Sequence, residues 1–85
     1  MRTLALREYL RELSDQRGAA YTYGVRSPLA TRPPGAADAP AYWPRLAIYR
    51  GSAEAFEGPM EHVRGDVYAV TFPRAGVRVS VYWFM

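Results

Sequence analysis

The chain of 85 residues contains no cysteine and no lysine, and it has a single histidine. Without cysteine there is neither a disulfide framework nor a thiolate metal site. A zinc site would have to rely almost wholly on carboxylates, because only one imidazole is available. We therefore expect no metal and no cofactor, and a fold held together by its core and turns alone.

Long apolar runs are also absent. No stretch approaches the roughly 18 residues needed to span a bilayer. The N-terminus carries Arg2, Arg7 and Glu8 where a signal peptide would need an apolar segment. These features predict a soluble, unprocessed, cytoplasmic protein with no membrane partner.

Charge of one sign forms no long run in the chain, and the one local bias is acidic, with Glu54, Glu57 and Glu61 within eight residues that contain no arginine. Eleven basic residues, all arginine, face eight acidic ones, which gives a net charge of +3. The two signs are interspersed, without the basic block or stripe that is typical of nucleic-acid-binding proteins. The many Arg, Ala, Gly and Pro residues indicate a GC-rich, and we infer bacterial, coding sequence.

The clearest structural pattern is a C-terminal β-hairpin, with strands predicted over 66–72 and 77–84. Two β-branched and aromatic runs flank the short connection Pro73 to Gly76. Pairing Phe72 with Val77 gives one almost wholly apolar face, because strand side chains alternate. The apolar pairs are Phe72 with Val77, Val70 with Val79, and Tyr68 with Val81. The other face pairs Thr71 with Arg78, Ala69 with Ser80, and Val67 with Tyr82.

A helix is predicted at the start of the chain, over about residues 3–17. Thr3 is a candidate N-cap and Gly18 a C-terminal stop. Between them, one apolar stripe has the helical spacing: Leu6, Tyr9, Leu10 and Leu13. A helix of this length is marginal alone in water, so it must pack on the inner face of the hairpin.

Two further strands are predicted, at 19–26 and 45–50, separated by a loop over 27–44 that holds five of the seven prolines. A single helical turn is predicted over 53–57, after Ser52 as its cap. These elements predict one α+β domain over residues 1–85. Its helix packs on one face of a mostly antiparallel sheet of about four strands, with the C-terminal hairpin as core.

One constellation has the residue types of a metal-independent ribonuclease: Glu57, Glu61, His62 and Arg64. Composition does not establish geometry, however. If the segment is extended, Glu61 and His62 point to opposite faces and cannot act as an acid/base pair. We therefore assign no catalytic residue, and a ribonuclease using His62 with a glutamate and an arginine is an alternative.

A second constellation interleaves arginine with aromatic residues and would suit stacking on bases. Its members are Tyr21, Tyr23, Arg26, Tyr42, Trp43, Arg45, Tyr49, Arg50, Arg78 and Tyr82. The chain has no ribonucleoprotein signature and no glycine-rich phosphate loop. Single-stranded nucleic-acid binding is therefore also an alternative.

A surplus of aromatic residues favours a third interpretation. Because one helix covers only one sheet face, several aromatics remain for a partner, and Tyr, Trp and Arg dominate interface hot spots. The predicted partner-binding residues are Trp43, Tyr42, Tyr82, Arg78 and Phe84, with a secondary acidic patch at Glu54, Glu57 and Glu61. A homodimer is one form such a contact can take.

The sequence thus predicts a small non-enzymatic protein-binding module. A compact domain without an active-site constellation is the kind of protein with which phages and mobile elements block a host machine, as anti-CRISPR-type proteins do. This expectation of an inhibitor that occludes a protein surface follows from the class of domain, not from particular residues.

Overall fold

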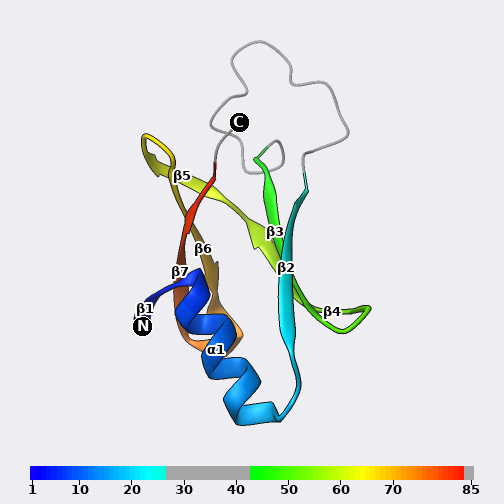
Figure 1. The fold of residues 1–85 in the computed structure, drawn as a ribbon. Helices are drawn as coiled ribbons and strands as arrows, with labels where there is room; N and C mark the ends of the chain where they lie inside the picture. The colour runs from blue at the N-terminus through cyan, green and yellow to red at the C-terminus, as the bar shows by residue number, and fades with distance from the viewer. Residues whose placement is uncertain (27–42, 84–85) are drawn as a thin grey trace.

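The computed structural model describes residues 1–26 and 43–83, and it confirms an α+β fold with an N-terminal helix packed on antiparallel sheets (Figure 1). The elements are β1 (Arg2–Ala5), α1 (Leu6–Arg17), β2 (Tyr21–Arg26), β3 (Arg45–Arg50), β4 (Ala53–Pro59), β5 (Glu61–Arg64), β6 (Val67–Phe72) and β7 (Val77–Tyr82). A 3₁₀ turn, Pro73–Ala75, joins the last two strands.

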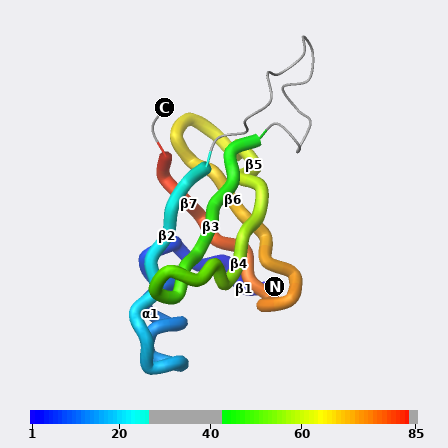
Figure 2. The backbone as a smooth tube through the Cα atoms, turned by 90° about the vertical axis from the view of Figure 1, so that its right-hand side faces the viewer, coloured from blue at the N-terminus to red at the C-terminus, as the bar shows by residue number. Residues whose placement is uncertain are grey.

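Within the described ranges these seven strands form two sheets, where the sequence predicted about four strands in one. The four-stranded sheet has the order β1-β7-β6-β5, and the three-stranded sheet has the order β2-β3-β4. Figure 2 looks onto the three-stranded sheet, with β6 and β7 behind it. The two sheets are therefore layers that share a core between them.

One continuous stretch of chain belongs to both layers. After Pro59 the chain leaves β4, and at Glu61 it enters β5 of the other sheet. Met60 lies at this corner, and its backbone N–H donates to the carbonyl of Pro44 at 2.7 Å. Strands that switch sheets form the closed corners of such packings, and here the corner joins β4–β5 to the start of β3.

The predicted register of the C-terminal hairpin is confirmed at every pair from Val67↔Tyr82 to Phe72↔Val77. The inner-face residues Tyr68, Val70, Val79 and Val81 are buried as expected. Gly76 has a φ of 65° and donates its N–H to the carbonyl of Pro73 at 3.1 Å, closing the turn. Glycine suits this position because it adopts positive φ without steric cost.

The helix begins at Leu6 rather than near residue 3, so the prediction of Thr3 as N-cap was wrong. Thr3 lies in β1 opposite Arg78 of β7, and the two strands run parallel. The N-cap is Ala5, which offers no side-chain hydrogen bond, while Gly18 closes the C-terminus as predicted, with a φ of 63°. The residues before Leu6, which the sequence pattern assigned to the first helical turn, therefore form a strand that pairs with β7.

The predicted helical turn over 53–57 was also wrong, because these residues belong to β4. They pair antiparallel with β3, with Ile48 opposite Phe56, and the register shifts between Ile48 and Tyr49. Phe56 packs against the core. The hydrogen bonds and apolar contact that β3 provides outweigh the weak local preference of this short segment for a helical turn.

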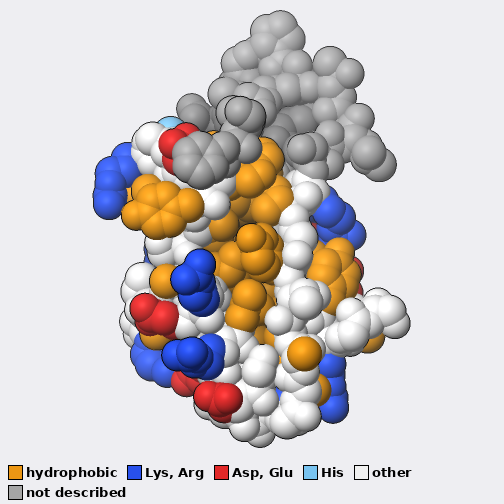
Figure 3. All heavy atoms as spheres, in the orientation of Figure 1, with side chains coloured by type: hydrophobic (Ala, Val, Ile, Leu, Met, Phe, Trp, Pro, Cys, Tyr) orange, Lys and Arg blue, Asp and Glu red, His pale blue; other side chains and the backbone are white. Residues whose placement is uncertain are grey.

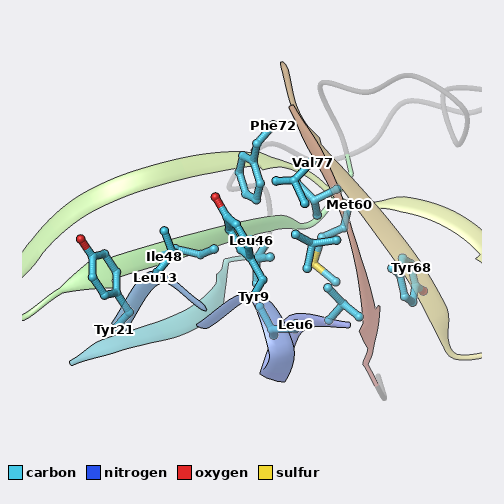
Figure 4. Close-up of a cluster of buried hydrophobic side chains, with 13 residues drawn as sticks. Leu6, Tyr9, Leu13, Tyr21, Leu46, Ile48, Met60, Tyr68, Phe72 and Val77 are labelled. Atoms are coloured by element: carbon cyan, nitrogen blue, oxygen red, sulfur yellow. The ribbon is translucent and has the colours of Figure 1, made fainter. Parts of the chain in front are cut away.

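The core lies between the two sheets and is closed on one side by α1. Figure 4 shows Leu6, Tyr9 and Leu13 of the helix among side chains of both sheets. The helical stripe is buried as predicted at these three positions, and Leu10 packs against the core while partly exposed. Among the described residues, no helix is long and apolar enough to cross a membrane.

Gly58 of β4 allows the two sheets to approach closely. A Cβ atom there would lie 2.9 Å from Cγ1 of Val70 and 3.6 Å from the ring of Phe72. Val70 is fully buried, and its β-branched side chain has little rotamer freedom with which to move aside.

We therefore expect Gly58→Ala to lower the free energy of unfolding by about 1–3 kcal/mol, measured by urea denaturation. Val70→Ala removes the crowding methyl group, so Gly58→Ala with Val70→Ala should cost less than the sum of the two single changes. The coupling should be about 0.5–3 kcal/mol. Strict additivity would contradict this contact.

Candidate functional site

The most prominent predicted site residue is Tyr82, at the end of β7. Along β7 the residues Val77, Val79 and Val81 are buried, whereas Tyr82 is 74% exposed. Tyr82 therefore lies on the outer face of the four-stranded sheet, the face that it shares with Arg78. The pleat places this large aromatic ring in solvent because its chain neighbours Val81 and Trp83 lie on the other face, where Val81 is buried and Trp83 packs against the core.

Tyr82 borders an open groove of about 570 Å³. The groove is lined by Ala5, Leu6, Arg7, Glu8, Leu10, Tyr23, Ser80 and Tyr82. Figure 3 draws the side of the molecule that carries α1, β2 and β7, and shows apolar side chains gathered in the middle of it, where the surface is hollowed. A volume of this size lies within the range of small-molecule pockets, although the groove is open rather than enclosed.

The groove exists because the two sheets are joined on only one side. The β4–β5 corner joins the two sheets on one side. On the side of the groove, β2 and β7 of the described chain are not paired with each other, so the space between the sheets stays open there. At this open side α1 fills part of the space, as Figure 1 shows. Its first two turns supply Leu6 and Leu10 to the groove, while β2 and β7 supply Tyr23 and Tyr82.

Arg78 is held in place on the outer face by two partners. One guanidinium nitrogen donates to Oγ1 of Thr71 at 3.1 Å, and the other donates to Oε2 of Glu61 at 3.0 Å. Because Thr71 and Glu61 belong to β6 and β5, the arginine spans three strands. Arg78 is thus an ordered, partly neutralised side chain on the same face as Tyr82, four residues before it in the chain.

The other predicted aromatic residues are less informative. Trp43 is partly buried at the start of the segment that leads into β3. Tyr42 and Phe84 lie outside the described residues. Of the predicted partner-binding set, the structure therefore brings Tyr82 and Arg78 together on one face.

The secondary acidic patch is a set of ion pairs. Glu54 contacts Arg26 at 2.9 Å, Glu57 contacts Arg26 at 3.6 Å and also Arg45, and Glu61 contacts Arg78 at 3.0 Å. The hydrogen bonds from Arg45 lower the pKa of Glu57 below its usual value. The arginines come from strands one or two places away in the same sheet, so the local excess of acid in the sequence is balanced in the fold.

His62, the centre of the ribonuclease alternative, lies in the short β5–β6 hairpin. Its Nε2–H donates to the carbonyl of Gly65 at 2.8 Å, and its ring lies 5.1 Å from that of Tyr68. The neighbouring carboxylates of Glu57 and Glu61 are engaged by arginines. In the part of the chain that the structure describes, no three His, Asp or Glu side chains are arranged to hold a metal ion.

The arginine and aromatic constellation is divided among different environments. Tyr21 is buried, Tyr23 opens onto the groove, and Arg26 and Arg45 face carboxylates on the outer side of the three-stranded sheet. A phosphate would have to compete with those carboxylates for the guanidinium groups. The stacking platform of the nucleic-acid alternative is thus not one continuous surface among the described residues.

Leu6, Leu10 and Tyr23 were not predicted as partner-binding residues, and Tyr23 was named only in the arginine and aromatic constellation. All three have the spacing of core positions, in the helical stripe and on the inner face of β2. Nothing in the local pattern distinguishes a buried inner-face residue from one at an open side of the core. Among the described residues β2 and β7 do not pair, and at this open side Tyr23 is half exposed and Leu10 partly exposed.

Comparisons of this chain with protein-family models, with curated proteins and with solved structures gave no match.

Proposed function

We propose that this domain is a non-enzymatic protein-binding module that contacts its partner through Tyr82 and the adjoining groove. The observation that carries the proposal is the exposure of Tyr82, 74% of whose surface is accessible beside an apolar hollow. Large exposed aromatic residues next to a preformed apolar pocket are typical interface anchors.

The chemistry of the groove indicates what kind of surface it accepts. Its apolar lining includes Leu6 and Leu10, and its two charged residues, Arg7 and Glu8, have opposite signs. This balance favours an apolar side chain of a protein over a phosphate, which requires a net positive site. Arg78, held by Thr71 and Glu61, adds an ordered polar group on the same sheet face as Tyr82.

Occlusion of a partner's surface is the mode of action that we propose. The supporting observation is that the titratable groups Glu57, Glu61 and His62 are engaged in structural contacts rather than directed toward the groove. An inhibitory role against a host machine stays a prediction from the class of domain.

Tyr82→Ala is expected to weaken partner binding at least about thirtyfold, because central aromatic anchors typically contribute 2 kcal/mol or more. Thermal melting should change little, since the side chain is mostly in solvent. Val63→Ala is the matched control, because Val63 is also exposed but lies at the far edge of the four-stranded sheet.

The experiment passes one bacterial lysate over immobilised wild-type, Tyr82→Ala and Val63→Ala proteins, and then measures the Kd of the retained protein by calorimetry. Equal retention by all three would contradict the proposed surface. Retention of nucleic acid instead, lost by about 200 mM salt, would support the nucleic-acid alternative.

A further inference from the structure

Strand β2 has one edge along which no strand of the described residues pairs. Among residues 1–26 and 43–83 it pairs with β3 alone, through an unbroken six-residue register. Alternate residues along its other edge direct N–H and C=O groups away from the sheet. From Tyr21 to Val25 the strand has no proline, no charged residue and no bulge, the features that normally prevent edge-to-edge pairing.

The inner face of β2 is only partly covered. Strand alternation puts Tyr21, Tyr23 and Val25 on this face. Tyr21 is buried and Val25 packs against the core, but Tyr23, between them, is 54% exposed. An aromatic ring on a core-facing position is therefore left half in solvent, beside an edge that can accept another strand.

We propose that a second copy of this chain pairs with that edge, β2 against β2, about a two-fold axis at Tyr23. A two-fold axis perpendicular to a sheet keeps each side chain on its own face. The opposed residues are then Tyr23 with Tyr23, Tyr21 with Val25, and Thr22 with Gly24. Aromatic and aromatic–β-branched pairs directly opposite each other stabilise antiparallel sheets.

This register is favoured over its neighbours by the length of β2. An axis at Thr22 would place Val25 opposite residue 19, and an axis at Gly24 would place Tyr21 opposite residue 27, both beyond the strand. Only the axis at Tyr23 pairs all three inner-face side chains within β2. The inner face of the strand is thus complementary to itself, which is why a copy is favoured over an unrelated extended segment.

The charges of β2 permit this contact. Its one charged residue, Arg26, would face Ala20 of the copy. Arg26 is also held by Glu54 at 2.9 Å and Glu57 at 3.6 Å, so no unbalanced like charges meet. The product is one continuous sheet with three strands from each copy, which removes the open β2 edge from both.

The absence of cysteine allows a direct test with single cysteines. Tyr23→Cys places two thiols directly opposite each other, with Cα atoms about 4.5–5.5 Å apart, which is within disulfide range. Thr22→Cys is the matched control, because its copy lies on the diagonal, about 7–8 Å away. Under mild oxidation we expect covalent dimer from Tyr23→Cys and little from Thr22→Cys. Equal cross-linking of both would overturn the register.

Charge reversal tests the pairing without oxidation. Tyr23→Lys and Tyr23→Glu should each sediment at the mass of one chain, because like charges then face each other, while their mixture should sediment at twice that mass. Circular dichroism melting checks that both variants fold. A mixture no more associated than its components, or wild-type protein that stays at single-chain mass at about 1 mM, would overturn the proposal. Tyr23 also lines the groove, so the copy and the partner of the proposed function would compete for it. Tyr82→Ala leaves β2 unchanged and should keep the dimer intact, so failure here is distinct from failure of the proposed partner surface.

Discussion

Phe72→Ala should lower the free energy of unfolding by about 3–5 kcal/mol, the range for truncating a buried phenylalanine. Phe72 is 5% exposed, and its ring stacks on Tyr9 of α1, with centroids 6.2 Å apart. It also meets the ring of Phe56 from β4, at 5.7 Å. The side chain therefore joins the helix to both sheets, and its loss leaves a cavity where three elements meet.

Urea denaturation followed by circular dichroism measures this effect. Domains of ordinary stability unfold with about 5–15 kcal/mol, so the variant should lose a large part of the total. Val63→Ala on the exposed edge strand β5 is the control and should change stability by less than about 0.5 kcal/mol. A loss at Phe72 below about 1 kcal/mol would contradict its place at this junction.

Met60→Ala is the second change for which we expect a large effect, about 2–5 kcal/mol. Met60 is 1% exposed and lies where the chain passes from β4 into β5. Figure 4 shows its side chain in the core cluster between the strands of the two sheets. Truncation removes apolar contacts to both layers at the only corner that joins them among the described residues.

Met60→Leu provides the matched control, because it keeps nearly the same volume and should cost less than about 1.5 kcal/mol. Both variants retain the backbone hydrogen bond from residue 60 to Pro44, so the difference between them isolates the side chain. Similar losses for alanine and leucine in a denaturant titration would show that the shape of the methionine, rather than buried volume, decides stability at the corner.

The C-terminal hairpin shows what could be predicted from the sequence. Its register from Val67 to Tyr82 follows from two alternating runs and a connection of fixed length. A slip by one residue would have turned Val70 and Val79 into solvent, so one pairing is strongly favoured. The helical stripe of Leu6, Tyr9 and Leu13 was predictable for the same reason, since the periodicity is local.

Three strands could not be predicted, because pairing rather than local pattern makes them strands. β1 and β5 have four residues each, too few to show alternation, and β1 depends on β7, far away in the sequence. In β4 the bulge opposite Ile48 and Tyr49 interrupts the period of two. The chain passes from one sheet to the other at Met60, and although Gly58 and Pro59 mark a break there, they do not show which sheet the next strand joins.

The candidate site, like the fold, could be predicted only in part from the sequence. Strand alternation by itself determined that Tyr82 and Arg78 lie on the outer face of the hairpin, because neighbouring side chains must point to opposite sides. Only the tertiary structure decided that Glu54, Glu57 and Glu61 pair with arginines one or two strands away in the same sheet. It also decided that Tyr23 is half exposed on an inner face, because burial depends on whether distant strands close the core, and β2 and β7 do not pair.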